Sequence, residues 1–331
     1  MSAGRSYATP EDYRDAIRAG DRRAMARAIT LLESTRPDQI ELGQSVLDSL
    51  IPDTGRAIRV GVTGPPGAGK SSLIEVLGLE LIEQGRRVAV LAVDPTSPVS
   101  GGSILGDKTR MELLAREPNA FIRPSPSGTS LGGVAQRTRE AMLVCEAAGY
   151  DVVLVETVGI GQSQVAVAAM VDFFLLVLLP AGGDELQGIK KGVVELADGL
   201  VVNKADGSTA EAAEGTRGDY ASALEVIRSP NASWSPQVLK TSAQERAGIT
   251  ELWEMILSHR SILEETGELE ERRRGQARQW MWSLVEEGLK AAFRTHEGVA
   301  GEIVRLENEV ETLQTTPSAA ARALLERFRT G

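Results

Sequence analysis

The sequence predicts an α/β fold, a mostly parallel sheet covered by helices on both faces, with helical extensions at the N- and C-terminal ends. Short apolar segments alternate with helical stretches between residues 51 and 262, as in sheets whose strands are joined by helices. Aromatic residues make up only 4% of a chain that is 42% hydrophobic, so the expected core is aliphatic. Residues 1–50 and 263–331 show helical patterns without strand signals.

The N-terminal extension, residues 1–50, has a clear helix start. Thr9 offers a capping hydroxyl, Pro10 suits the first helical position, and the two acids that follow complement the positive helix end. The arginines of this region are interpreted as a solvated face rather than an anion site. An apolar stripe is expected at Ile17, Met25, Ile29 and Leu32.

Six strands are expected in the central region. Their sequences are "AIRVGVT", "RRVAVLAVD", "DVVLVET", "VDFFLLVLLP", "ADGLVVNKAD" and "QVLKTSA". Helices are expected between several of them, over residues 134–148, 185–197 and 209–227. This order of elements predicts one domain at residues 51–262.

The C-terminal region, residues 263–331, is charged and helical, and we interpret it as a dimerisation arm. Its segment "VAGEIVRLENEVETLQ" carries Ile303, Leu306, Val310 and Leu313 at the spacing of a short coiled-coil seam. The alternative is that these residues pack back onto the chain's own core. The charged flanks favour the pairing of two chains.

Composition excludes several classes of function. The formal net charge of −10 is poorly matched to nucleic acid or to an anionic membrane, and neither is expected as a partner. The single cysteine, Cys145, is interpreted as a buried apolar residue, and the two histidines leave little material for a zinc or nickel cage. No apolar run is long enough for a membrane span and no leader is recognisable, so a cytoplasmic protein is expected.

A glycine-rich loop between the first strand and the first helix of the central region fits the pattern GxxxxGK[ST]. Its glycines let backbone N–H groups converge on a phosphate, and the helix start adds its positive end. Lys70 can reach the β- and γ-phosphates, and the Ser71 hydroxyl can bind Mg²⁺. The expected nucleotide-binding residues are Gly64, Pro65, Pro66, Gly67, Ala68, Gly69, Lys70, Ser71 and Ser72.

A second motif, "NKAD", identifies the base as guanine. The Asp206 carboxylate can accept hydrogen bonds from N1–H and from the 2-amino group of guanine, which adenine cannot supply. The Lys204 stem can lie over the ring, and Asn203 completes the motif. After the next strand, Thr241, Ser242 and Ala243 are expected to finish the base pocket from the backbone.

Acidic residues at two strand ends predict a magnesium site. Asp94 and Glu156 follow apolar strands, and ligands bind at the carboxyl edge of parallel sheets. Asp107 lies in a candidate switch, "SPVSGGSILGDKTRM", whose alternative is an ordinary surface loop. Gly159 in "ETVGIGQ" can touch the γ-phosphate. Lys70, Asp94, Asp107, Glu156 and Gly159 are thus the expected catalytic group, with Ser71 and the three acids as metal ligands.

Hydrolysis is expected to be slow without a partner. Many GTP hydrolases carry a glutamine directly after the glycine of this motif, but Gly159 is followed by Ile160. The missing stabilisation would come from a partner, the other subunit or a loop movement. The stretch "PAGGDELQGIKKG", residues 180–192, is a candidate for this role, although an exposed helix start would also explain it.

The motifs "GPPGAGKSSLIE", "VDPTSPVSGGSILGDKTRM", "ETVGIGQSQ", "LPAGGDELQGIKKG" and "NKADG" together resemble the G-protein chaperones of methylmalonyl-CoA mutase. This is the MeaB type, long confused with an arginine/ornithine transport-system kinase. The resemblance covers residues 10–330. It implies a P-loop GTPase that binds GTP or GDP with Mg²⁺ and forms a homodimer through C-terminal helices.

The resemblance also implies a partner, the adenosylcobalamin-dependent methylmalonyl-CoA mutase. Such proteins gate cofactor delivery, protect the mutase from inactivation and hydrolyse GTP faster in its presence. A third switch loop signals to the mutase, and Asp184, Gln187 and Lys190 are the matching positions here. The alternatives are a nickel-insertion GTPase of the same class, disfavoured by the scarcity of histidine and cysteine, and a P-loop kinase, disfavoured by the guanine motif.

Overall fold

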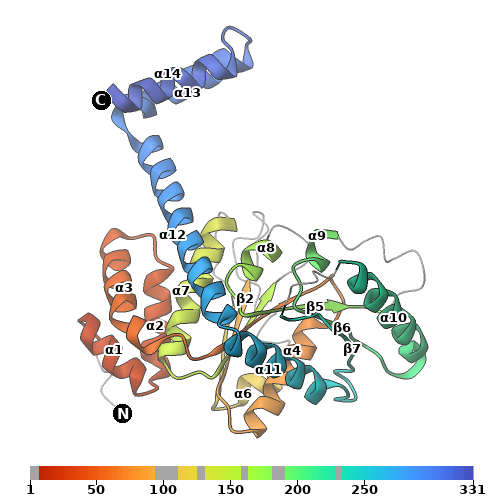
Figure 1. Cartoon of the computed structure of the whole chain (residues 1–331). Helices are drawn as coiled ribbons and strands as arrows, with labels where there is room; N and C mark the ends of the chain where they lie inside the picture. The colour runs from red at the N-terminus through yellow and green to blue at the C-terminus, as the bar shows by residue number, and fades with distance from the viewer. Residues whose placement is uncertain are drawn as a thin grey trace. The chain divides into compact units, whose positions relative to one another are not determined.

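The computed structural model describes residues 7–93, 111–124, 131–157, 163–180, 191–227 and 233–330 (Figure 1). The chain divides into two compact units, Met1–Arg273 and Arg274–Gly331. The functional division into an extension, a G domain and a dimerisation arm stays a prediction.

The first unit is built on a seven-stranded sheet whose strands all pair in parallel, in the order β3-β2-β4-β1-β5-β6-β7. The strands are β1 (Ile58–Thr63), β2 (Val88–Val93), β3 (Ala120–Arg123), β4 (Val152–Thr157), β5 (Phe173–Leu178), β6 (Gly199–Val202) and β7 (Val238–Lys240). The expected α/β class is confirmed. Strands β2, β4 and β5 are buried along their whole length, which explains their uninterrupted apolar sequences.

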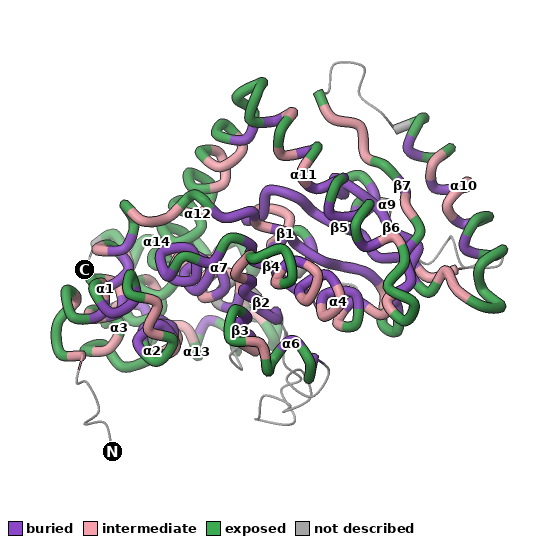
Figure 2. The backbone as a smooth tube through the Cα atoms, turned by 90° about the horizontal axis from the view of Figure 1, so that it is seen from below, coloured by how far each residue is buried: buried purple, intermediate pink, exposed green. Residues whose placement is uncertain are grey.

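Helices cover both faces of the sheet, and the strands between them are the most buried part of the chain (Figures 1 and 2). On one face, the core is completed by α1 (Pro10–Arg18), α2 (Arg22–Leu32), α3 (Pro37–Leu50), α7 (Leu131–Ala147), α8 (Ser163–Ala168), α9 (Lys191–Val194) and α10 (Ala210–Ile227). On the other face, it is completed by α4 (Lys70–Glu83), α6 (Glu112–Arg116) and α11 (Ile249–Glu265). Among the described residues, this unit also has two short 3-10 turns, Ile51–Asp53 and Gly207–Thr209.

Strand β3 is the one strand of the described sheet that was not predicted from the sequence. It has only four residues, "AFIR", and it pairs with β2 alone, at the edge of the sheet. So short a segment carries no periodicity that separates a strand from a loop.

The N-terminal extension forms three helices, and its expected start is confirmed. Thr9 accepts a hydrogen bond from the Asp12 backbone N–H, and the Asp12 carboxylate accepts one from the Thr9 backbone N–H. The four residues of the expected apolar stripe are all buried: Ile17, Met25, Ile29 and Leu32. These residues share one hydrophobic core with α7 and one face of the sheet, so the three helices pack on the sheet with α7.

Two arginines at the start of α12 (Glu268–Thr295) form ion pairs with aspartates at the N-terminal ends of β5 and β6. Arg273 Nη2 lies 2.6 Å from Asp172 Oδ2, and Arg272 Nη2 lies 2.9 Å from Asp198 Oδ1. Burial raises the pKa of the Asp198 carboxyl, but the nearby His259, with Nε2 at 3.5 Å from Oδ1, and the hydrogen bonds from Arg272 lower it by more, so its pKa lies below the ordinary value. Since Asp198 and Asp172 directly precede the two strands, this network fixes where the strands begin.

A buried carboxyl, Glu140, lies between α3 and α7. Its Oε1 accepts hydrogen bonds from Gln44 Nε2 at 3.0 Å and Gln136 Nε2 at 3.2 Å. Its Oε2 is buried without a hydrogen-bond partner among the described residues. Burial raises the pKa of the Glu140 carboxyl, and the two amide hydrogen bonds offset this only in part.

Glu140→Gln is therefore expected to make the protein more stable at pH 8 and to change its stability little at pH 4. A carboxyl whose pKa is higher in the fold than in the unfolded chain holds its proton more tightly in the fold, so stability falls as the pH rises from the unfolded pKa through the folded one. Urea unfolding at several pH values measures this slope. Glu225→Gln, at an exposed position of α10, is the control. An unchanged slope in the Glu140 variant would contradict the prediction.

The second unit contains the rest of α12 and a helical hairpin of α13 (Glu297–Glu311) and α14 (Pro317–Thr330). Phe328 packs against Phe293 and His296, with ring centroids 5.3 and 5.2 Å apart. Leu306, one of the expected seam residues, is buried in this unit. The expected seam spacing extends past the helix, because α13 ends at Glu311 and Leu313 beyond it is 91% exposed, and the pairing of two chains stays a prediction.

No described helix combines the length and apolar character needed to cross a membrane.

Candidate nucleotide-binding site

The phosphate loop predicted from the sequence connects β1 to α4, and two of its glycines are required by close contacts. Gly64 has φ 150°, and a Cβ there would lie 2.2 Å from the carbonyl oxygen of Val177 on β5. Gly69 has φ 83°, and a Cβ there would lie 2.5 Å from Asn203 Nδ2. The loop therefore packs directly on β5 and on Asn203, the first residue of the "NKAD" motif.

Lys70, the first residue of α4, is 8% exposed and turns its ammonium back over the loop. Nζ donates hydrogen bonds to the carbonyl oxygens of Gly64, at 2.9 Å, and Pro65, at 3.1 Å. The cation thus lies over the turn in which an anionic group is expected to bind.

Ser71 and Glu156 meet at the carboxyl edge of the sheet. Ser71 Oγ donates to Glu156 Oε1 at 2.7 Å, and Glu156 is 5% exposed at the end of β4. The structure thus brings together two of the residues predicted to bind a metal ion, which lie 85 positions apart in the sequence.

The side chain of Asn203 joins the two motifs. Its Nδ2 donates to the carbonyl oxygen of Ala68 at 2.8 Å, across 135 positions of sequence. Its Oδ1 accepts from Thr241 Oγ1 at 3.2 Å, and the residue is 1% exposed. Both polar atoms of the Asn203 side chain therefore form hydrogen bonds that connect the phosphate loop, the "NKAD" segment and the "TSA" segment.

Ser242 orients the carboxylate of Asp206. The Ser242 hydroxyl accepts a hydrogen bond from the Glu245 backbone N–H at 3.0 Å and donates its proton to Asp206 Oδ2. The backbone adds a further link, from Ala205 N–H to the Thr241 carbonyl at 3.0 Å. One oxygen of the Asp206 carboxylate is thus held by the protein.

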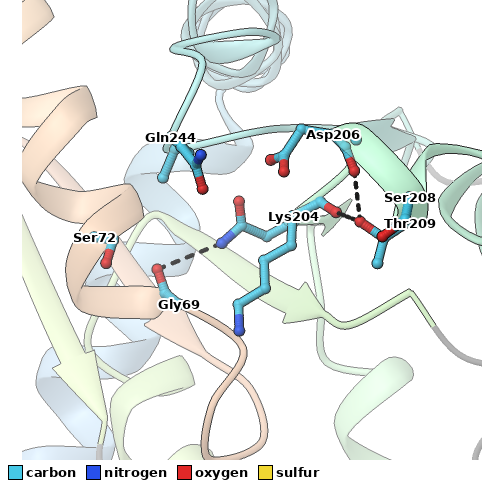
Figure 3. A pocket seen from close by; sticks show the side chains of 10 residues that line it. Gly69, Ser72, Lys204, Asp206, Ser208, Thr209 and Gln244 are labelled. Atoms are coloured by element: carbon cyan, nitrogen blue, oxygen red, sulfur yellow. Dashed lines mark hydrogen bonds between the residues drawn. The ribbon is translucent and has the colours of Figure 1, made fainter.

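Lys204 has a left-handed backbone conformation, φ 58°, which is uncommon for a residue with a side chain. The Thr209 hydroxyl lies 2.5 Å from the Lys204 carbonyl and 2.7 Å from the Asp206 carbonyl, and it supports this turn (Figure 3). Figure 3 shows the Lys204 side chain extending along the pocket toward Gly69. An aliphatic stem in this position can cover one face of a flat ring.

The end of the phosphate loop, the start of α4, the "NKAD" segment and the "TSA" segment border a cleft of about 500 Å³. Its lining consists of Gly69, Ser72, Asn203, Lys204, Asp206, Gly207, Ser208, Thr209, Ala243 and Gln244. Four of these residues were not predicted from the sequence, although each lies within three positions of a predicted motif residue: Gly207, Ser208, Thr209 and Gln244. Adjacency to the motifs is the signal that could have identified them.

Six predicted site residues fall in parts of the chain that the structure does not describe. Asp94, Asp107 and Gly159, and the three switch positions Asp184, Gln187 and Lys190, lie outside the described residues. Within the described part of the chain, no group of three or more His, Cys, Asp or Glu side chains is arranged to hold a metal ion.

The geometry has two chemically distinct ends. One is cationic and rich in backbone N–H groups, at Gly64–Lys70, and suits phosphate. The other presents the Asp206 carboxylate and suits a ring edge with two N–H donors. The strands β1 and β6, which lead into these ends, belong to one parallel sheet, which brings both ends to the same edge.

Comparison with known proteins identifies the family. Residues 25–298 match the family model "Methylmalonyl Co-A mutase-associated GTPase MeaB". A putative GTPase of Caulobacter vibrioides is 55% identical over 94% of this chain and 95% of its own length. The mitochondrial "Methylmalonic aciduria type A homolog" of Mus musculus is 46% identical over 94% of this chain and 77% of its own length.

A solved structure described as a LAO/AO transport system kinase superposes with a TM-score of 0.79 at 39% sequence identity, covering 99% of this chain and 100% of that one. The agreement of sequence and fold over nearly the whole length confirms the resemblance seen in the motifs. The chain therefore belongs to the MeaB family of methylmalonyl-CoA mutase-associated GTPases.

Proposed function

We propose that this protein binds GTP and GDP in the cleft between the phosphate loop and the "NKAD" segment, and hydrolyses GTP. The observation that carries the proposal is the hydrogen bond from Asn203 Nδ2 to the Ala68 carbonyl. It holds the phosphate-binding and base-binding segments at the two ends of one cleft, where the Asp206 carboxylate is positioned by Ser242. The names of the relatives support the same activity.

The residues present fit Mg²⁺ as a cofactor. Ser71 Oγ and Glu156 Oε1 are hard oxygen atoms of the type that Mg²⁺ prefers, and they already face each other at 2.7 Å. Asp94 and Asp107 are the further ligands that the sequence predicts. When bound, the ion would neutralise charge that develops on the β- and γ-phosphates.

The proposed biological role is that of a chaperone for adenosylcobalamin-dependent methylmalonyl-CoA mutase, gating cofactor delivery and protecting the mutase from inactivation. The family match supports the association. Slow hydrolysis that the mutase accelerates is proposed because Ile160 occupies the position where many GTP hydrolases carry glutamine. The signalling role of Asp184, Gln187 and Lys190 remains part of this proposal.

Release of inorganic phosphate from GTP and ATP, with and without the purified mutase, tests the proposal. At equal subsaturating concentrations, kcat/KM for ATP is expected to be at least about 100-fold lower, since adenine leaves the Asp206 carboxylate without a donor. The mutase is expected to raise the rate of GTP hydrolysis. Equal use of ATP would remove the assigned base recognition, whereas a GTP rate indifferent to the mutase would remove the chaperone role and leave the GTPase.

We further propose that the protein is a homodimer through its C-terminal helices. Met281, Val285 and Leu289 are spaced by four residues on α12, so they lie on one side of the helix, next to Trp282. Their exposed fractions are between 41 and 57%. Apolar side chains gathered in this way are typical of a surface that a second copy covers.

Trp282→Glu is expected to convert the dimer to a monomer, because it places a charge in the proposed contact. Ser283→Glu, which adds the same charge outside this apolar side, should leave the dimer intact. Light scattering after size exclusion measures the mass of each variant. A wild-type protein of monomer mass would overturn the dimer proposal without affecting nucleotide binding.

The proposal of a cytoplasmic location rests on cysteine usage. The chain has a single cysteine, Cys145, which is buried in α7. Burial raises the pKa of its thiol, so it is unreactive as well as unable to form an internal disulfide.

A further inference from the structure

We propose that the hydroxyl groups of Thr63 and Thr157 form a positioning element of the nucleotide site, which holds the end of β4 so that the Glu156 carboxylate faces Ser71. The inference deepens the proposed Mg²⁺-dependent binding of GTP and GDP and rests on it. Neither threonine faces the cleft, so both act through Glu156 rather than on the nucleotide.

The two side chains join β1 to β4 at the carboxyl edge of the sheet. Thr157 Oγ1 lies 2.9 Å from Thr63 Oγ1 and 3.4 Å from the carbonyl oxygen of Val62. Both threonines are 0% exposed. A hydrogen bond in so dry an environment is stronger and more directional than one at the surface.

The position of the pair along the strands gives it a role. The register between β1 and β4 ends with the pair Val62 and Glu156. One residue further on, Thr157 is still paired with Val93 of β2 on its other side. On the β1 side, the contact between the two threonine hydroxyls is therefore the next link beyond the last registered pair.

Alternation along the strand couples this link to the metal ligand. Glu156 and Thr157 are neighbours in a strand, so their side chains point to opposite faces of the sheet. Glu156 contacts Ser71 on the face covered by α4, and Thr157 contacts Thr63 on the other face. Contacts on both faces fix the rotation of the strand end, and the loss of one of them frees the other to turn.

The packing around Thr63 leaves little room for adjustment. Gly61 lies two positions earlier on the same face, and a Cβ there would lie 2.8 Å from Val167 Cγ1 of α8. Helix α8 thus packs directly on the backbone of β1, one step below the hydroxyl pair. The hydroxyl pair is held between this helix contact and the loop that begins at Gly64.

Release of a fluorescent GDP analogue, measured across a range of Mg²⁺ concentrations, tests the proposal. Thr157→Val and Thr63→Val keep the shape of the side chain and remove one hydroxyl. Each variant is expected to raise, about three- to tenfold, the Mg²⁺ concentration at which release of the analogue reaches half of its Mg²⁺-dependent change. This factor corresponds to the loss of one hydrogen bond. Thr157→Ser should restore the wild-type value. Affinity for the analogue in EDTA should not change.

Two further variants separate positioning from simple stability. Thr138→Val is the matched control, because Thr138 is also buried and its hydroxyl donates to the Val134 carbonyl within α7, at 2.8 Å, away from the two strand ends. The double variant Thr63→Val/Thr157→Val leaves no hydroxyl unpaired, so its stability should be close to that of the wild type. Its Mg²⁺ requirement should nevertheless stay raised.

A double variant with the Mg²⁺ dependence of the wild type would overturn the positioning role and reduce the pair to a structural contact. If the wild-type protein binds the analogue equally well with and without Mg²⁺, the proposed metal dependence itself is overturned. The two failures are therefore distinguishable in one set of measurements.

Discussion

Lys70→Ala is expected to lower kcat/KM for GTP by at least about 100-fold, the usual loss when a cationic group that stabilises transferring phosphate is removed. In the structure, Lys70 Nζ is held 2.9 Å from the Gly64 carbonyl and 3.1 Å from the Pro65 carbonyl. The ammonium is thus kept over the loop before any nucleotide arrives. Because the Lys70 side chain already has this position, it loses little conformational freedom when it contacts the β- and γ-phosphates. Its removal therefore costs the full interaction with the phosphates.

Two measurements make this result specific to phosphate binding. Lys290→Ala removes a lysine from the exposed surface of α12 and should leave kcat/KM unchanged. Thermal unfolding without nucleotide shows whether the loss of the two hydrogen bonds of Lys70 disturbs the fold. A folded Lys70→Ala protein with wild-type affinity and rate would contradict the assignment of the phosphate loop.

The sequence predicted the sheet well because parallel strands are buried on both faces and read as uninterrupted apolar segments. Six of the seven strands, and α7 and α10, follow from that pattern and from helical periodicity. Strand β3 does not, because four residues at an edge owe their conformation to pairing with β2. Apolar spacing also does not locate the end of α13, since it continues through Leu313 although the helix ends at Glu311.

The site was predictable to the extent that its chemistry is local in sequence. The phosphate loop and the "NKAD" segment are contiguous motifs, and the rule that parallel strands end at one edge predicts that they meet. The way they meet was not predictable. The Asn203 bond to Ala68 and the Ser242 bond to Asp206 depend on strand register and loop shape, which no motif encodes.

The same reasoning separates residues that touch a ligand from those that hold others in place. Asn203 was predicted as a binding residue, and the structure shows both of its polar atoms engaged by Ala68 and Thr241. Thr63 lies in no motif, and Thr157 lies within "ETVGIGQ", where the motif gives roles only to Glu156 and Gly159. Only the register that places them side by side suggests a role.

Asp206→Asn is expected to lower the affinity for GTP by a factor on the order of 10² to 10⁴ and to make xanthine nucleotides the preferred ligands. Guanine offers two N–H donors to the carboxylate, and an amide can accept from only one of them while its own N–H₂ group faces the other. Xanthine carries an oxygen where guanine carries the 2-amino group, so it accepts a hydrogen bond from the amide at that position.

Ser242 decides which way the new amide points. Because the Ser242 hydroxyl accepts from the Glu245 N–H at 3.0 Å, its proton is directed at the side chain of residue 206. It should therefore hold the carbonyl oxygen of the amide and leave the N–H₂ group toward the base. Competition between GTP and XTP for a fluorescent GDP analogue measures the change in preference.

The double variant Asp206→Asn/Ser242→Ala tests this orientation directly. Without the hydroxyl, the amide is free to rotate, so the preference for xanthine should shrink while the loss of GTP affinity remains. Asp219→Asn, an exposed aspartate on α10, is the control for the change of charge. Undiminished selectivity for GTP in Asp206→Asn would mean that the ring edge is recognised elsewhere, and the cleft between the two motifs would no longer explain the choice of base.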